Sequence, residues 1–151
     1  MDRVEIATLK KAFENDLPYV ADEIREHLEI PSVTILTGDV GVGKTTFTKA
    51  FCPELDITSP TYAIISEYSD FLHGDLFRLN GPEEVLHLEL GLYVENKKWI
   101  FFEWGIEHAS MLYKLLGDDF VFYELNISTN KPTDSTANPS RNFNLSSIGG
   151  F

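Results

Sequence analysis

Residues 33–48 read VTILTGDVGVGKTTFT, and the fold class follows from this segment. It begins with a short β-branched apolar run at 33–36, bounded by Pro31 and Gly38, which is typical of a buried strand. Residues 38–45, GDVGVGKT, match the phosphate-binding loop pattern G-x-x-x-x-G-K-[ST]. The helical segment TTFTKAF follows. The order of strand, glycine-rich loop and helix predicts a P-loop nucleotide-binding fold.

The chemistry expected of this loop is the binding of a nucleoside triphosphate. Glycines let the backbone turn its N–H groups toward an anion, and the next helix adds its positive dipole end. Lys44 is expected to contact the β- and γ-phosphates, and the Thr45 hydroxyl is expected to bind Mg²⁺. The predicted nucleotide-binding residues are Gly38, Asp39, Val40, Gly41, Val42, Gly43, Lys44, Thr45 and Thr46.

Composition limits the classes of protein to which the chain can belong. Its 151 residues are 43% hydrophobic, which suits one domain with its own core, and we predict a single domain over 1–151. The formal net charge of −12 argues against strong nucleic-acid binding by this chain alone. Cys52 is the only cysteine, so an internal disulfide is excluded. With neither a secretory signal nor a membrane-spanning apolar run, we expect a cytoplasmic protein.

Hydrophobic periodicity predicts the other elements of an α/β fold, with a core at about 18–128. Two extended runs, 62–68 and 71–77, follow the loop helix and predict an antiparallel hairpin, unlike the strict alternation of a nucleotide kinase. We therefore expect a central mixed sheet flanked by helices. The other expected strands are 4–9, 98–102, 120–128 and, at an edge, 141–146, so that a C-terminal hairpin spans about 120–147 before a frayed end at 148–151. The expected helices are 10–15, 17–28, 45–51, 82–90 and 106–116.

Two carboxylates are the predicted partners of the loop, because a P-loop needs an acidic side chain near Mg²⁺. Glu103 closes the apolar strand, and Asp75 lies among apolar neighbours in the hairpin. Either could bind Mg²⁺ or orient the attacking water. Thr61, in a Ser-Pro-Thr loop, could respond to the γ-phosphate. Trp104 is expected to pack against the site or a partner, and His73 is interpreted as a structural hydrogen-bond donor.

Four motifs in sequence order, GDVGVGKTTF, SPTYAIISEY, HGDLFRL and FFEW, resemble the bacterial TsaE (YjeE) family. The resemblance covers about residues 18–128 and, more weakly, the strand around Arg141. It implies a small P-loop ATPase needed for the threonylcarbamoyl modification of adenosine 37 in tRNAs that read codons starting with A. It further implies ATP and Mg²⁺ as cofactors and the TsaD–TsaB pair as partner, with tRNA contacted only through that complex.

The family's functional residues match six positions of this chain. Lys44 and Thr45 match the Walker A lysine and the Mg²⁺ ligand, and Thr61 matches a switch-like threonine. Asp75 and Glu103 match two functional carboxylates, and Trp104 matches the tryptophan beside the second. The chain departs from the family pattern in three places: Ile106 replaces a frequent acidic residue, the N-terminal segment has no clear adenine-holding match, and the loop at 130–140 is longer.

Other nucleotide-binding classes fit the sequence less well. A small-molecule kinase would close an arginine-rich lid over the phosphates, whereas the four arginines here are scattered. A GTPase would carry an N-K-x-D motif, but the chain reads NKKW at 96–99. A nucleotide-sensing module without turnover remains open, because hydrolysis is slow when a partner must complete the site.

Overall fold

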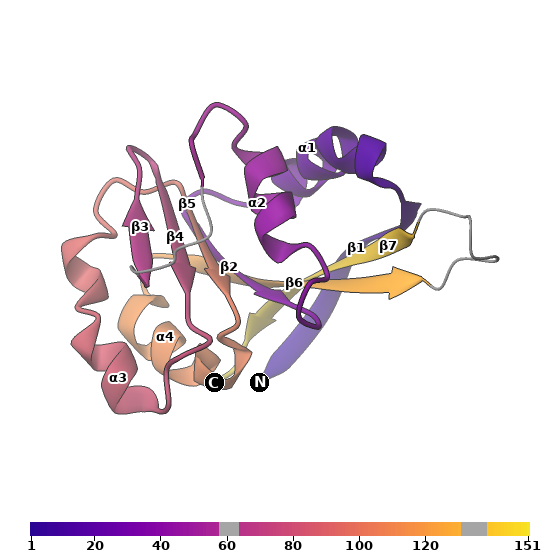
Figure 1. The fold of residues 1–151 in the computed structure, drawn as a ribbon. Coiled ribbons are helices and arrows are strands. Elements are labelled where there is room, and N and C mark those ends of the chain that lie inside the picture. Colours follow the sequence, from indigo (N-terminus) through magenta and orange to yellow (C-terminus); the bar gives the residue numbers. More distant parts are fainter. Residues whose placement is uncertain (58–63, 131–138) are drawn as a thin grey trace.

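The computed structural model describes residues 1–57, 64–130 and 139–151, and all its strands belong to one seven-stranded sheet (Figure 1). The strands are β1 (Asp2–Ala12), β2 (Ser32–Thr37), β3 (Ile65–Glu67), β4 (Phe71–Asp75), β5 (Trp99–Glu103), β6 (Val121–Asn130) and β7 (Ser140–Gly149). The helices are α1 (Leu17–His27), α2 (Lys44–Phe51), α3 (Pro82–His87) and α4 (Ala109–Leu116). Short 3-10 turns, η1 (Glu14–Asp16), η2 (Leu90–Leu92) and η3 (Ile106–His108), complete the described elements.

The sheet is mixed, as predicted, with the strand order β1-β7-β6-β2-β5-β4-β3. Its four central strands, β6, β2, β5 and β4, run parallel, and the remaining pairs are antiparallel. Strand β2 lies between β5 and β6 and is the 33–36 run recognised from sequence. Because parallel strands end at one edge of a sheet, the segments that follow β2, β4 and β5 meet there.

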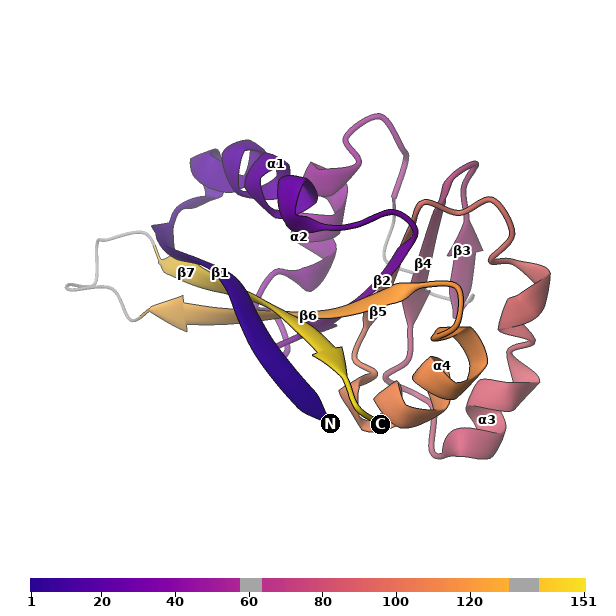
Figure 2. The ribbon, with the colours of Figure 1, turned by 180° about the vertical axis from the view of Figure 1, so that it is seen from behind.

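Helices cover both faces of the sheet (Figures 1 and 2). Helices α1 and α2 cover one face, where Phe47 and Phe51 pack against sheet residues such as Phe101. Helices α3 and α4 cover the other face, where Leu112 packs with Phe102. Neighbouring residues of β5 enter opposite clusters because side chains alternate across a strand. No helix in the described parts of the chain is long and apolar enough to cross a membrane.

The hairpin predicted after the loop helix is confirmed where the structure describes it, since β3 pairs antiparallel with β4. Residues 58–63, which include the start of the predicted first strand, lie outside the described residues. Strand β4 then joins β5 in parallel, in the register Gly74 to Phe102. The hairpin therefore ends at the same sheet edge as the phosphate-binding loop.

Three predictions at the chain ends were wrong, for one physical reason. The expected helix at 10–15 is instead the end of β1, followed by the turn η1. The expected edge strand β7 is internal, because β1 pairs along it from Asp2 to Ala12. The expected frayed end at 148–151 is ordered in its first half, since β7 continues to Gly149 and Ile148 is buried in the core. Pairing between residues about 140 positions apart produced all three differences (Figure 2).

Candidate active site

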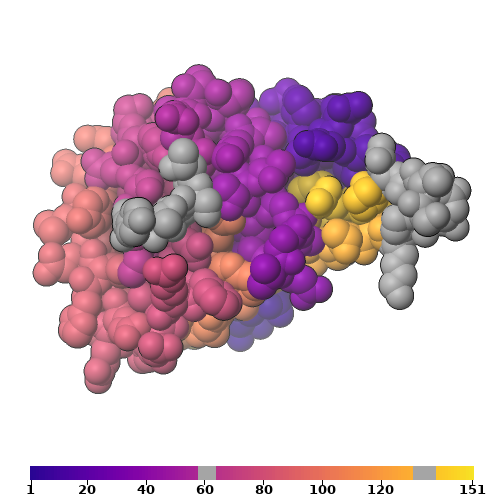
Figure 3. Space-filling model, viewed as in Figure 1, coloured from indigo at the N-terminus to yellow at the C-terminus, as the bar shows by residue number. Residues whose placement is uncertain are grey.

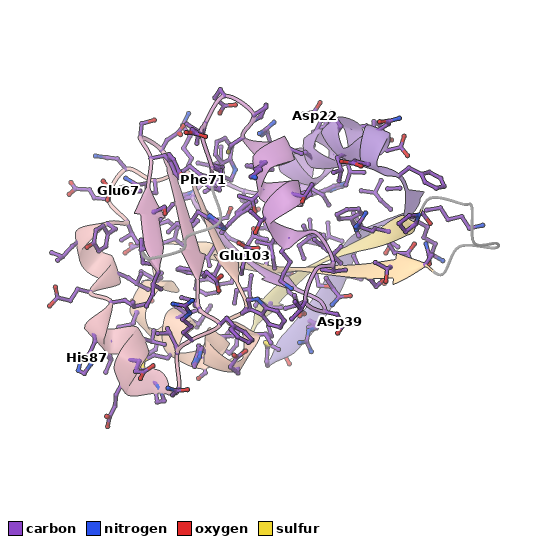
Figure 4. The ribbon with its side chains drawn as sticks, viewed as in Figure 1. Asp22, Asp39, Glu67, Phe71, His87 and Glu103 are labelled. Atoms are coloured by element: carbon purple, nitrogen blue, oxygen red, sulfur yellow. The ribbon has the colours of Figure 1, made fainter. Side chains whose placement is uncertain are left out.

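The site forms where three parallel strands end side by side. Glu103, the last residue of β5, is paired in register with Leu36 of β2 on one side and Asp75 of β4 on the other. Figure 4 shows Glu103 at the centre of the sheet near the start of α2, with Asp39 farther out on the loop. Strand ends of this kind are where α/β proteins bind ligands.

The loop between β2 and α2 has a backbone that requires glycine at two positions. Gly38 has φ 138°, and a Cβ there would lie 2.3 Å from the Ile127 carbonyl oxygen. Gly43 has φ 110° and precedes the first helical residue. L-residues with a side chain rarely adopt such angles. The loop thus curls tightly onto β6 and leaves the first N–H groups of α2 free for an anion.

Lys44 lies against this loop with little exposure to solvent. Its Nζ donates to the carbonyl oxygens of Gly38 and Asp39, at 2.7 and 3.1 Å. The ammonium also lies 3.8 Å from the centre of the Trp104 ring, a cation–π contact. Burial lowers the pKa of Lys44, and the negative charges of Glu103 and other nearby carboxylates partly oppose this shift. A buried ammonium held by neutral carbonyls is poorly neutralised, which favours binding of an anion.

The Thr45 hydroxyl and the Glu103 carboxylate form the most compact polar contact of the site. Thr45 Oγ1 lies 2.7 Å from Glu103 Oε1 and 3.0 Å from Oε2. Oε2 also lies 2.7 Å from Nε2 of His73, which is completely buried on β4. Glu103 itself is 4% exposed, so its charge is stabilised by these two contacts in place of water.

Aromatic side chains form one wall of the site. Trp104 directly follows β5 with φ 57°, an uncommon angle for a residue with a side chain, and its N–H donates to the Leu36 carbonyl oxygen. The Trp104 and Phe77 rings have centroids 5.0 Å apart. Asp75 precedes this pair, and its Oδ1 accepts a hydrogen bond from the Phe77 backbone N–H at 3.0 Å. Asp75 is thereby held at the edge of the site.

These residues enclose a cavity of about 360 Å³ that opens on the face shown in Figure 3. The rim includes Val40 and Phe77, whose side chains are 80% and 61% exposed. The cavity combines cationic, carboxylate and aromatic groups, a combination typical of ligand sites. The lining residues are Val40, Gly41, Gly43, Lys44, Thr45, Thr46, Asp75, Phe77, Glu103 and Trp104.

The oxygen atoms of the site suit Mg²⁺. A hydroxyl and one or two carboxylates are hard ligands of the kind that this ion takes, with phosphate oxygens and water completing its shell. Within the described residues, no group of three or more histidine, cysteine, aspartate or glutamate side chains could hold a metal alone. Thr45 and Glu103 are therefore suited to a metal that arrives together with a phosphate ligand.

A second, smaller cavity of about 120 Å³ adjoins the other side of the loop. Leu17 and Glu14 line it from the N-terminal part of the chain, and Thr46 lines it from α2. Arg141 and Phe143 line it from β7, and the Arg141 Nε donates to the Val42 carbonyl oxygen of the loop. Gly43 and Thr46 line both cavities, so the smaller one lies next to the larger at the start of α2.

The structure brings nine of the sequence-predicted residues together around the cavity: Val40, Gly41, Gly43, Lys44, Thr45, Thr46, Asp75, Glu103 and Trp104. Gly38, Asp39 and Val42, also predicted to bind nucleotide, are not among the residues that line it. Thr61 lies outside the described residues. Cys52, the only cysteine, is buried, and burial raises its thiol pKa to about 12.

Sequence reasoning missed three contacts of the site. His73 had been interpreted as a structural hydrogen-bond donor, but its partner Glu103 was not identified, although His73 lies two residues before Asp75 and therefore on the same strand face. Phe77, which packs against Trp104, lies in the HGDLFRL motif, but the motif did not indicate this contact. Arg141 reaches the loop from a strand about 100 residues away, and no local pattern indicates that contact.

Comparison with known proteins agrees with this geometry. The family model described as "Threonylcarbamoyl adenosine biosynthesis protein TsaE" matches residues 12–137. Curated relatives named "tRNA threonylcarbamoyladenosine biosynthesis protein TsaE" are similar to the chain. The Nostoc protein is 44% identical over 47% of this chain and 48% of the relative, and the Bacillus subtilis protein is 37% identical over 58% and 64%. The Haemophilus influenzae protein is 32% identical over 59% and 61%.

The chain thus aligns with only part, 48–64%, of the length of these relatives. A crystal structure of Bacillus subtilis YdiB matches 98% of this chain and 87% of that chain, with a TM-score of 0.57 and 22% identity. This likeness shows a shared fold, the mixed α/β P-loop architecture. Since the family model matches residues 12–137, which is most of the sequence, the chain belongs to the TsaE family.

Proposed function

We propose that this protein is an ATPase that acts in N6-threonylcarbamoyladenosine modification of tRNA. The observation that carries the proposal is the Thr45 hydroxyl 2.7 Å from the Glu103 carboxylate, beside the buried Lys44 ammonium. A hydroxyl, a carboxylate and a cation at the start of a P-loop helix are the groups that bind a magnesium nucleotide. Membership of the TsaE family supports the assignment to tRNA modification.

Each group of the site has a distinct proposed role. Backbone N–H groups of the loop and the Lys44 ammonium stabilise charge that develops on the γ-phosphate during transfer to water. Thr45 and Glu103 would hold Mg²⁺, which would supply positive charge to the phosphates when bound. Asp75 lies at the cavity edge beside Glu103 and orients the attacking water, or binds the metal through water. Trp104 limits solvent access to Lys44 by covering its ammonium.

The small cavity beside Thr46 is the proposed location of the nucleoside. It shares Gly43 and Thr46 with the phosphate site at the start of α2, and Leu17 and Phe143 give it apolar surface. The Arg141 side chain adds a planar guanidinium, which stacks well on aromatic rings. This placement uses residues before the loop and near the C-terminus, where sequence reasoning left the adenine contacts blank.

We propose that the cavity mouth faces the TsaD–TsaB pair and that hydrolysis cycles that complex between rounds. The rim side chains Val40 and Phe77 are exposed although they are apolar, which suits contact with another protein. The net charge of −12 is consistent with tRNA contact only through the partner complex. In this scheme the transfer of the threonylcarbamoyl group belongs to TsaD.

The kinase alternative receives no support from the described site. Arg3 pairs with Glu124, Arg25 lies over the Phe51 ring, and Arg141 holds the loop from the side. None of the four arginines lines the larger cavity. A lid of arginines over the phosphates is therefore absent from the parts of the chain that the structure describes. A nucleotide sensor without turnover is distinguished from an ATPase only by experiment.

The test is phosphate release from Mg·ATP by the protein alone and with TsaD–TsaB. We expect slow release alone and faster release with the pair. Lys44→Ala serves as the blank, and Glu103→Gln should lower release by about 100-fold or more, because the lost charge holds the metal and acts in the transition state. Binding of metal-free ATP should persist in this variant, because its contacts are the loop and Lys44.

Three outcomes would contradict the proposal. Fast phosphate release that does not change when the partner pair is added would show that turnover does not depend on these partners. Transfer of phosphate to a small acceptor would indicate a kinase. Tight ATP binding with no release under either condition, in wild type and Glu103→Gln alike, would leave a nucleotide sensor as the function.

A further inference from the structure

His73 lies behind the active-site carboxylate and does not line the cavity. Its side chain has no exposure to solvent, and its Nε2 lies 2.7 Å from Glu103 Oε2. On β4 it pairs in register with Phe101, two residues before Glu103 on β5. Nucleotide bound in the cavity would therefore meet Glu103 without touching His73.

The contact defines which nitrogen of His73 carries a proton. The Glu103 carboxylate can only accept, so Nε2–H is the donor. His73 Nδ1 is buried and has no hydrogen-bond partner among the described residues. The neutral form with a proton on Nε2 leaves only a lone pair unpaired there, whereas a proton on Nδ1 would leave a buried donor unpaired.

The hydrogen bond also distinguishes the two oxygens of Glu103. Oε2 accepts from His73, while Oε1 makes the shorter contact with the Thr45 hydroxyl. Without His73, the Glu103 side chain would gain rotational freedom at the strand end, and its fixed orientation would depend on Thr45 alone. Partners behind a ligand group commonly set its orientation in this way.

We propose that His73 is a positioning residue that holds Glu103 Oε2, so that Oε1 faces Thr45 and a magnesium ion delivered with the nucleotide. This inference rests on the proposed function. It assigns to His73 a role in the affinity for the magnesium nucleotide, but none in the affinity for the metal-free nucleotide, whose contacts are the loop and Lys44.

Two substitutions of similar size separate this role from simple packing. Glutamine can place its amide NH₂ where Nε2 lies, whereas the shorter asparagine reaches only the position of Nδ1. We expect His73→Gln to retain the donor to Glu103 and His73→Asn to lose it. A side chain that merely filled space would give no preference for the donor at the Nε2 position.

The measurement is the affinity for a fluorescent ADP analogue, with Mg²⁺ and with EDTA. In wild type we expect Mg²⁺ to tighten binding. The tightening should persist in His73→Gln and weaken by about 10-fold in His73→Asn, the lower end of typical effects for groups behind a metal ligand. Affinities in EDTA should agree within about twofold among the three proteins, because the loop contacts do not involve His73.

His108→Asn is the matched control. His108 is another buried histidine, with its Nε2 3.9 Å from Glu107 Oε1, and it lies outside the cavity lining. We expect this variant to keep the full effect of Mg²⁺. Equal loss in His73→Asn and His108→Asn, equal behaviour of His73→Gln and His73→Asn, or parallel losses with Mg²⁺ and EDTA would overturn the inference.

A measurement on the unaltered protein covers the case in which a variant fails to fold. In ¹⁵N-labelled wild type, His73 should carry a proton on Nε2, as its contact with Glu103 requires, and a proton on Nδ1 alone would overturn the inference. Failure of the proposed function looks different: wild type would release no phosphate although Mg²⁺ still tightened nucleotide binding in a His73-dependent way.

Discussion

The parallel strands β2, β5 and β4 and the antiparallel strands β7 and β1 contribute to this protein in different ways. The first group ends in the polar residues of the site, and each of its strands is only five or six residues long. The second group is built from strands of ten or eleven residues, and neither of them lines the larger cavity. Chemistry lies at the ends of short buried strands, and the long outer strands support it from the side.

The difference is visible in how each group contacts the phosphate-binding loop. Glu103 of β5 faces the loop with a carboxylate that accepts from the Thr45 hydroxyl. Arg141 of β7 instead donates to the backbone carbonyl of Val42, and it lies close to Gly43. The first contact presents a charge to the ligand site, whereas the second holds the loop backbone. Stability and activity should therefore respond separately to changes in the two groups of strands.

Leu145→Ala should give the largest effect, confined to stability. Leu145 of β7 is completely buried and pairs with both β1 and β6. The lost contacts and the resulting cavity should lower the free energy of unfolding by about 2–5 kcal/mol, measured by urea denaturation. The exposed Leu92, 72% accessible, provides the control Leu92→Ala, which should change stability by less than about 0.5 kcal/mol.

The activity of the folded Leu145→Ala protein decides whether the two groups are independent. Measured at a temperature where the variant remains folded, its phosphate release with the partner pair should match wild type. A loss of turnover in the folded variant would show that core packing around β7 affects the active site. The proposed separation between strands that stabilise the fold and strands that carry the activity would then be wrong.

Asp75→Asn tests the opposite case, a change at the end of a parallel strand. Asparagine keeps an oxygen that can accept from the Phe77 N–H but removes the negative charge. We expect phosphate release to fall by about 10- to 100-fold, with a change in unfolding free energy below about 1 kcal/mol, because Asp75 acts on the reaction and is not part of the core.

Asp39→Asn is the matched control for Asp75. Asp39 is exposed on the loop, also lies near Lys44, and is outside the cavity lining. Its substitution removes the same charge without removing a group that faces the site. If both variants lost turnover equally, the effect would come from the general field around Lys44, and the specific role of Asp75 would be wrong.

The same contrast explains what could be predicted from the sequence. Strand β2, its loop and α2 are contiguous, so the motif at 38–45 and the flanking apolar pattern identify them directly. Glu103 was found because it closes a short apolar run, and Asp75 was found because it lies among apolar neighbours in the predicted hairpin. For these parts of the chain, local sequence contains the information that fixes the structure.

The outer strands could not be predicted in the same way. Residues 10–15 contain good helix formers, yet pairing with β7 keeps them extended as far as Ala12, with Lys11 at φ 56°. Tertiary pairing overrides such local preferences. The contacts of His73 with Glu103 and of Arg141 with the loop also join residues distant in sequence, and only the folded sheet brings them together.

Arg3→Ala should give the smallest effect and tests whether the outermost strand is tied electrostatically to the site-bearing strands. Arg3 Nε on β1 reaches across β7 to Glu124 Oε1 on β6, at 2.6 Å, and Glu124 Oε2 accepts from Thr37 at the end of β2. Arg3 is half exposed, so the pair should contribute only about 0.5–1 kcal/mol to the free energy of unfolding.

The loss of unfolding free energy expected for Arg3→Ala should be smaller at high salt, because at about 1 M the screening length falls to about 3 Å. Lys10→Ala is the control on the same strand, since Lys10 is exposed and makes no ion pair with the residues that the structure describes. If Arg3→Ala lowered the free energy of unfolding as much as Leu145→Ala, and equally at low and high salt, Arg3 would act through packing of β1. Strand β1 would then contribute to stability as a core strand does, although most of its residues are exposed.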